Sequence, residues 1–160
     1  MKEKLEKWMP YILSAALALG VGLLSALLSA NGMTHYEEFA IKPALTPPGW
    51  LFSVAWTALY ILMGISAARI WQLPDGPERS KGLNLYVLQL VFNFFWSLIF
   101  FNAQAYGFAA FWLLALLGMV FLMIRQFNKL DRTAAYLQLP YLFWLIFAAY
   151  LNIGVWVLNS

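Results

Sequence analysis

Five long apolar stretches constrain this chain more than any other feature of its sequence. They cover residues 8–30, 50–71, 84–102, 106–126 and 134–157, and none of them contains an aspartate or a glutamate. A helix needs about 20 mostly apolar residues to cross a hydrocarbon core of ~30 Å. Because each stretch is long enough, the sequence predicts an all-α membrane protein, a bundle of five transmembrane helices.

The composition excludes the common soluble classes. Of the 160 residues, 63% are hydrophobic and 11% are charged, whereas a soluble domain has roughly 25% charged residues. The chain is also far too apolar for a disordered protein. It has no cysteine, so disulfides, thiolate metal sites and cysteine nucleophiles are impossible. At this length we expect residues 1–160 to form a single domain.

The breaks between the stretches carry ordinary turn signals. Asn31-Gly32 ends the first stretch, residues 74–77 (Pro-Asp-Gly-Pro) end the second, and residues 128–132 end the fourth. The third break is weaker, but one helix over residues 84–126 would be about twice as long as the bilayer is thick. We therefore expect a tight turn at Asn102-Ala103-Gln104.

The basic residues predict the orientation of the bundle. Nine of the ten lysines and arginines fall at the end that carries the N-terminus, and only Lys42 falls at the opposite end. Cytoplasmic loops carry an excess of lysine and arginine, so we expect a cytoplasmic N-terminus and an exterior C-terminus. Residues 31–49 then form an outer loop. This placement explains the positive charge, and no nucleic-acid partner is expected.

The stretches hold no cluster of ionisable groups. All seven acidic residues fall in termini or loops, and the only histidine, His35, falls in the outer loop. Buried ionisable groups mark proton relays and ion pathways, so a proton-coupled pump or an ion channel is disfavoured. A histidine-ligated haem or a His/carboxylate metal cluster cannot be assembled, and no metal site is expected.

Small residues recur at every fourth position of the first stretch, at Ala18, Gly22, Ala26 and Ala30. Such a ridge lets another helix approach closely. Packing within the chain is the simpler interpretation, and a dimer seam is the alternative.

Uncharged polar residues recur in the same way in the third stretch. Gln89, Asn93 and Ser97 share one helix face, with Trp96 beside them. A side-chain amide in lipid needs a partner, so this face is expected to point into the bundle. Hydrogen bonding between helices and contact with a polar group of a ligand explain it equally well.

Aromatic rings are spaced to share a pocket. The second stretch carries Phe52, Trp56 and Tyr60 on one face, and the fifth carries Trp144 with Ala148 one turn later. Trp56 lies about 9 Å from the exterior end of its helix, and Trp144 lies near mid-membrane. Core packing explains each tryptophan alone. Together with the amide face, they predict an internal aromatic pocket for a flat apolar ligand.

The end of the outer loop is rich in proline. Prolines fix the backbone before a helix, where their missing N–H groups do no harm, so the chain enters the second helix rigidly. Long ordered loops often act as lids. A lid and a plain exposed connection are the two interpretations, and the candidate lid residues are Lys42, Pro43, Pro47, Pro48 and Gly49.

Three motifs, in order, carry a family resemblance over nearly the whole chain. They are K-P-x-x-T-P-P-G-W at residues 42–50, followed by Trp56, Thr57, Leu59 and Tyr60; residues 85–101 with Asn93 and Trp96; and residues 139–144 (Leu-Pro-Tyr-Leu-Phe-Trp), leading to residues 147–152 and to Val155-Trp156. With these motifs the chain resembles bacterial members of the TspO family, the translocator proteins also called peripheral-type benzodiazepine receptors.

The resemblance implies a five-helix bundle, commonly a homodimer, in a bacterial cell membrane. It implies binding of tetrapyrroles such as protoporphyrin IX and of benzodiazepine-type ligands, with no required cofactor and the lipid bilayer as the surrounding partner. The implied ligand-binding residues, to which the amide face adds Gln89, are Phe52, Trp56, Tyr60, Asn93, Trp96, Trp144, Phe147, Ala148 and Leu151.

Three functions are compatible with such a pocket. The first is a tetrapyrrole sensor or carrier. The second is an enzyme, because bacterial relatives are associated with light- and oxygen-dependent degradation of protoporphyrin, which implies Trp56 and Trp144 as catalytic residues. The third is a transporter of tetrapyrroles or lipophilic ligands, although an odd number of spans does not divide into two inverted halves.

Two departures from the family pattern bear on ligand preference. Leu45 stands where family members often have tryptophan, which affects the lid. Ile153 and Val157 occupy the tyrosine and basic positions of the cholesterol-recognition pattern. Sterol binding is therefore not predicted.

Overall fold

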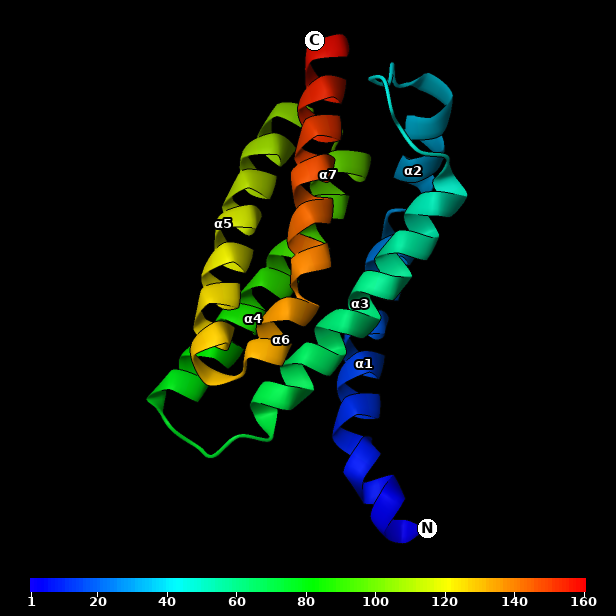
Figure 1. The fold of residues 1–160 in the computed structure, drawn as a ribbon. Coiled ribbons are helices and arrows are strands. Elements are labelled where there is room, and N and C mark those ends of the chain that lie inside the picture. Colours follow the sequence, from blue (N-terminus) through cyan, green and yellow to red (C-terminus); the bar gives the residue numbers. More distant parts are fainter.

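The computed structural model describes residues 1–160, all of them in helices or short connections (Figure 1). Five helices are long and apolar enough to cross a membrane, which confirms the predicted fold class. The elements are α1 (Lys2–Leu28), α2 (Ala30–Phe39), α3 (Gly49–Trp71), α4 (Pro77–Ser97), the π-helical turn η1 (Leu98–Asn102), α5 (Tyr106–Leu130), α6 (Arg132–Leu137) and α7 (Leu139–Leu158).

The long helices form a ring that is incompletely closed. The helix α1 packs along α3, α4 packs on α5, and α5 packs on α7, while α1 also touches α4. The remaining neighbours, α3 and α7, approach each other only slightly. Figure 1 shows α3 leaning away from α7 toward the end of the molecule that carries the C-terminus, while the N-terminus lies at the opposite end.

The helices cover the five predicted membrane spans, but their bounds differ from the span bounds at several ends. The helix α1 begins at Lys2 rather than near residue 8, because the lysines and glutamates at its start are good helix formers. The predicted fifth span is two helices, α6 and α7, that meet at Gln138. Pro140 lies in the first turn of α7, where its missing N–H and fixed backbone favour a new helix start.

The predicted outer loop contains a helix, α2, that the sequence analysis missed. Its residues are polar on average, so no apolar periodicity marks it. Contacts with the turn after α4 stabilise it instead: the Tyr36 ring meets the edges of Phe100 and Phe101, at centroid distances of 5.5 and 5.3 Å. Gly32 lies against the Phe101 backbone, where a side chain has no room. Residues 40–48 remain as an irregular loop.

The tight turn expected after the third stretch is present. The π-helical turn ends at Asn102 and α5 begins at Tyr106. Gln104 adopts a left-handed backbone, with φ of 53°. The Asn102 side-chain amide donates to the carbonyl of Leu28 at 2.8 Å, which ties this turn to the end of α1.

The C-terminal end of α3, which carries Arg69, is fixed to α6. The Arg69 guanidinium meets the Asp131 carboxylate at 2.7 Å, and the same carboxylate accepts from the backbone N–H of Thr133 at the start of α6. Ser66 adds a hydrogen bond of 2.7 Å to the carbonyl of Ala134. The helix α3 is therefore held at this end and diverges from α7 toward the other.

Small residues hold α1 against α3. Ala18 is fully buried, and Gly22 lies against the Tyr60 ring. On the facing helix, Gly64 lies against the backbone of Ala15 and Ser14. The first half of the small-residue ridge thus packs within the chain, whereas Ala26 and Ala30 face outward.

Gly64→Ala is expected to lower the free energy of unfolding by about 1–3 kcal/mol, because the added methyl group overlaps backbone atoms that cannot move aside. Thermal unfolding in detergent measures the change. Gly118→Ala is the matched control: nothing lies within 4 Å of its added carbon, so we expect no loss, or a gain of up to about 1 kcal/mol from helix propensity. Equal behaviour of the two variants would contradict the close approach of α1 and α3.

Candidate functional site

A cluster of aromatic rings fills the space between α3 and α7. The Trp56 ring lies 5.7 Å from Tyr60 and 6.3 Å from Trp144, the latter nearly perpendicular at 87°. Phe52 meets the Trp144 ring edge-on at 5.7 Å, and Tyr141 meets Trp56 at 6.2 Å. The four-residue spacing of Phe52, Trp56 and Tyr60 places them on one face of α3, as predicted.

The amide face of α4 also lies inside the bundle, as expected. Asn93 accepts a hydrogen bond from the Tyr60 hydroxyl at 2.8 Å and donates one to the Tyr141 hydroxyl at 2.7 Å. Tyr141 in turn donates to Gln89 at 2.8 Å. The sequence left two interpretations open, and hydrogen bonding between helices is the one that applies to Asn93. Both its side-chain oxygen and its side-chain NH2 group form hydrogen bonds with tyrosines of neighbouring helices. The Gln89 Nε2 group is buried without a hydrogen-bond partner.

Trp96 lies apart from the ring cluster, near the C-terminal end of α4. Its Nε1 donates to the Asn152 side chain at 3.0 Å, and Asn152 donates onward to the Tyr106 carbonyl at 2.9 Å. The Trp96 ring stacks on Phe100 at 5.1 Å. This tryptophan therefore joins α4 to α7, and it packs against both the main core and the smaller cluster below α2.

The remaining predicted ligand-binding residues line α7. Ala148 and Leu151 are buried, while Phe147 is half-buried, with its ring 5.7 Å from that of Trp144. Tyr141 is not among the predicted site residues, although it lies three positions before Trp144 and so shares its side of the helix. The four-residue series that runs through Trp144 and Ala148 reaches Asn152, a signal that could have found the partner of Trp96.

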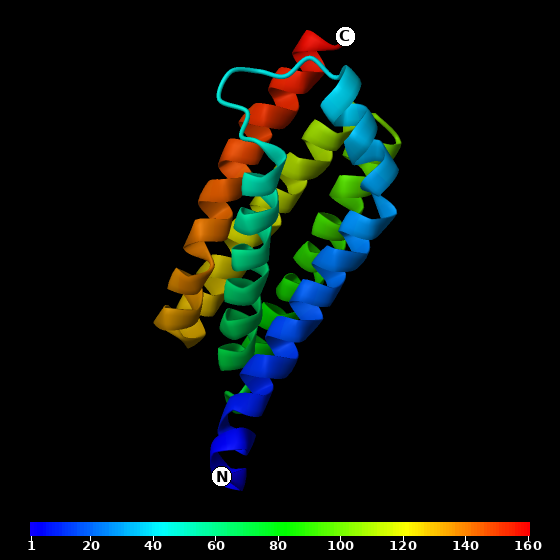
Figure 2. The ribbon, with the colours of Figure 1, turned by 90° about the vertical axis from the view of Figure 1, so that its right-hand side faces the viewer.

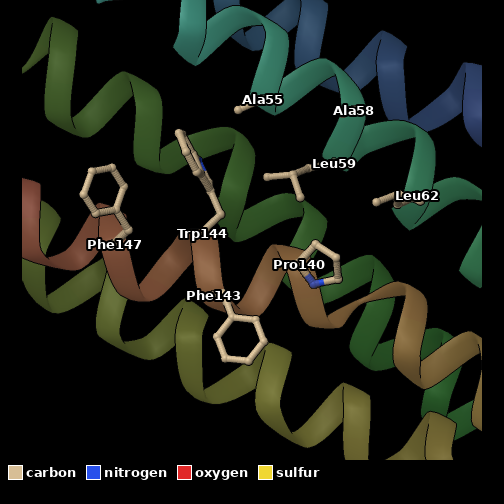
Figure 3. Close-up of a pocket in the computed structure, with 8 residues that line it drawn as sticks. All are labelled: Ala55, Ala58, Leu59, Leu62, Pro140, Phe143, Trp144 and Phe147. Atoms are coloured by element: carbon tan, nitrogen blue, oxygen red, sulfur yellow. The ribbon is translucent and has the colours of Figure 1, made fainter. Parts of the chain in front are cut away.

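An open groove runs beside the ring cluster. It has a volume of about 430 Å³ and is lined by side chains of α3 and α7, seven of the eight being hydrophobic: Ala55, Ala58, Leu59, Leu62, Pro140, Phe143, Trp144 and Phe147. Figure 3 shows Trp144 rising from α7 toward Ala55 on α3, with Leu59 beside it. This open volume is thus a groove along the side of the bundle, and Trp144 is the member of the ring cluster that lines it.

The loop over residues 40–48 crosses the C-terminal half of α7 on its way from α2 to α3 (Figure 2). Asn159 bonds the backbone of Ile41 twice, accepting at 2.9 Å and donating at 2.8 Å. The Tyr150 hydroxyl donates to the Ala44 carbonyl at 2.8 Å. Pro43 lies against Gly154, where a larger residue has no room. These contacts hold the loop down on α7.

The candidate lid residues have different positions in this loop. Lys42 donates to the carbonyls of Glu37 and Ala40, at 3.0 and 3.3 Å, and its ammonium lies 5.0 Å from the centre of the Tyr36 ring. Pro47 and Pro48 lead directly into α3. Pro48 has an extended backbone with ψ of 155°, and Gly49 lies against the Glu37 side chain.

Two further residues lie at or in the loop: Tyr36 on α2 contacts Lys42, and Leu45 belongs to the loop itself. Burial, reinforced by Tyr106 and Glu37, raises the pKa of Tyr36 to about 12, so below that pH its ring stays a neutral partner for the Lys42 ammonium. Leu45, the departure from the family pattern, is 80% exposed. It adopts a left-handed backbone with φ of 70° and points away from the bundle.

Residues 14–157 match the TspO/MBR family. The chain belongs to this family. It is 32% identical to the tryptophan-rich protein TspO of Chlorobaculum tepidum over 155 residues, which cover 92% of this chain and 94% of that protein. It is 39% identical to the protein CrtK of Rhodobacter capsulatus over 119 residues, 74% of each chain.

A mammalian relative shows the same likeness. The translocator protein of Ovis aries is 38% identical over 135 residues, which cover 83% of this chain and 79% of that protein. The resemblance found from the motifs is therefore confirmed, and the chain is a multi-pass membrane protein of the TspO/MBR family.

Tyr141→Phe is expected to lower the free energy of unfolding by about 1–2 kcal/mol, because it removes one partner each from Asn93 and Gln89 inside the bundle. Unfolding in detergent, followed by helical circular dichroism, measures the loss. The matched control is Tyr136→Phe on α6, an exposed tyrosine, which should change little. A neutral Tyr141→Phe would mean that the three-helix network adds nothing to stability.

Asn159→Ala is expected to free the loop, because it removes both hydrogen bonds to Ile41. Hydrogen exchange of the Ile41 amide should become faster by roughly fivefold or more, the equivalent of losing about 1 kcal/mol of local protection. Asn128→Ala, at an exposed asparagine in the last turn of α5, is the control. Unchanged exchange at Ile41 would show that the loop is held by Tyr150 and Pro43 alone.

Proposed function

We propose that this chain binds flat, lipophilic aromatic ligands of the tetrapyrrole type, with protoporphyrin IX as the test case, and that it acts as a sensor or carrier for them. The observation that carries the proposal is the convergence of the Phe52 and Trp56 rings on Trp144, whose own ring lines an apolar groove. Benzodiazepine-type ligands, which are also flat and aromatic, would use the same rings.

The affinity must come from specific contacts rather than from the hydrophobic effect. A lipophilic ligand is already in an apolar medium when it is dissolved in the bilayer, so moving it into a protein gains little from water exclusion. Offset or edge-on contacts with aromatic rings contribute about 0.5–1.5 kcal/mol each. The buried, unpartnered Nε2 of Gln89 is a donor for a carbonyl or carboxyl group of the ligand.

The name of one relative favours sensing. One relative, from Cereibacter sphaeroides, is called a tryptophan-rich sensory protein and is 36% identical over 118 residues. The eight tryptophans of this chain agree with the description "tryptophan-rich". What the chain reports on, if it is a sensor, is set by the ligand that its ring cluster accepts.

A second candidate function rests on the distance between two indoles. Trp56 and Trp144 lie 6.3 Å apart, edge to face, so a porphyrin held against this pair would lie beside two readily oxidised side chains. With light to excite the porphyrin and molecular oxygen as the oxidant, the site could support oxidative degradation of the ligand without a metal. No feature of the structure favours the transporter alternative.

We also propose that the N-terminus is cytoplasmic in a bacterial cell membrane. Nine of the ten lysines and arginines lie at that end of the bundle, and the positive-inside rule supports this orientation. Labelling of single cysteines introduced at Glu3 and at Ser160, in a chain that has no native cysteine, tests it in intact cells.

Titration of the detergent-purified protein with protoporphyrin IX, followed by tryptophan fluorescence, should show saturable quenching. The double variant Trp56→Phe, Trp144→Phe keeps two rings but loses indole contact area, and we expect about tenfold weaker binding, or ~1.4 kcal/mol. Trp50→Phe and Trp71→Phe, both exposed, form the matched control pair. Wild-type affinity in the double variant would remove these indoles from the site.

Illumination with and without oxygen separates the two candidate functions. A defined product that needs oxygen and disappears in the double variant would establish the enzyme. Nonspecific bleaching of equal extent in both proteins would leave the sensor or carrier.

A further inference from the structure

We propose that ligands reach the ring cluster sideways from the bilayer, through the groove between α3 and α7, which acts as an entrance site for flat lipophilic molecules. This inference rests on the proposed binding function and adds the route by which a ligand reaches the binding site. Its groove-lining residues Ala55, Ala58 and Leu62 are outside the predicted ligand-binding set.

The groove lies at the depth of the acyl chains. Its lining on α3 runs from Ala55 to Leu62, which is about 9–20 Å along a helix of about 35 Å. On α7 the lining begins at Pro140 and ends at Phe147, again in the middle of the fifth span, Arg132–Leu158. A ligand dissolved among acyl chains therefore meets the opening without crossing a polar layer.

Two other routes into the bundle are closed by direct contacts. The loop over residues 40–48 is fixed to α7 by Asn159, Tyr150 and the contact between Pro43 and Gly154. The seam between α1 and α3 is closed by glycines whose added side chains would overlap the facing helix. Opening either would break hydrogen bonds or close packing, whereas the groove is already open.

Nothing polar joins α3 directly to α7. The hydrogen bonds near the groove run from Tyr60 on α3 to Asn93 on α4, and from Asn93 to Tyr141 on α7. Each helix is thus held by α4 rather than by the other, so no hydrogen bond spans the opening itself. Ala55 and Ala58 have small side chains, so no bulky side chain blocks the α3 side of the opening at these two positions (Figure 3).

The Trp144 side chain separates the groove from the rest of the ring cluster, so its rotation would connect the two. It lines the groove and also contacts Phe52 and Trp56. Its Nε1 group is buried and has no hydrogen-bond partner, whereas Trp96 and Trp112 each donate to a fixed acceptor. A rotation of the Trp144 side chain therefore breaks ring contacts only, and the indole N–H can find a partner on an incoming ligand.

The test uses protein in vesicles, mixed rapidly with protein-free vesicles that carry protoporphyrin IX, with tryptophan quenching as the readout. Ala58 is exposed in the groove, so Ala58→Phe fills the opening without disturbing the core. We expect association and dissociation rates to fall together by about tenfold, with the equilibrium affinity within about twofold. Ala115→Phe, at an exposed alanine on α5, should leave both rates unchanged.

A reversible block removes any concern about folding. Because the chain has no cysteine, Ala58→Cys can be modified with benzyl methanethiosulfonate and restored with dithiothreitol in the same sample. The rates should fall on modification and recover on reduction, while Ala115→Cys shows no change.

Three other results would contradict the lateral route. Equal rates before and after the block would overturn the lateral route while leaving binding intact. Faster association in Asn159→Ala would show entrance under the loop, and would overturn the lateral route in the same way. If the unmodified protein shows no saturable quenching, the binding function fails, and the entrance fails with it.

Discussion

Lipid does not solvate polar groups, so polar side chains inside the bundle must form hydrogen bonds with one another. The bundle depends most on Asn93, which links three helices in this way. Its amide has one acceptor and one donor committed to tyrosines of two other helices, at 2.8 and 2.7 Å. In hydrocarbon, each of these groups is costly when unpaired. The bonds therefore fix α3 and α7 relative to α4, and they determine where the aromatic rings of those helices meet.

The parts of the fold that could be predicted from sequence are those set by one helix at a time. Apolar length gave the five spans, and four-residue spacing placed Phe52, Trp56 and Tyr60 on one face and buried Gln89, Asn93 and Ser97. These patterns report which side of a helix avoids lipid. They do not report which partner a buried group finds, so the choice between helix contact and ligand contact for Asn93 needed the structure.

What could not be predicted depends on contacts between distant segments. The helix α2 forms because Tyr36 and Gly32 fit against the turn after α4, and its own sequence is too polar to show it. Asn159 lies beyond the last predicted span, and nothing nearby in the sequence connects it with Ile41, 118 residues away. The side groove results from a difference in tilt between α3 and α7, which no helical periodicity encodes.

Because the groove is open at mid-membrane depth, ligand occupancy depends on the concentration of ligand in the bilayer rather than in water. The relevant quantity is the mole fraction of ligand in the bilayer, which equals its aqueous concentration multiplied by a partition coefficient. Two ligands with the same ring contacts would then differ in apparent potency according to their solubility in lipid. Adding more membrane at constant total ligand would dilute the ligand and lower occupancy, even though no contact at the site has changed.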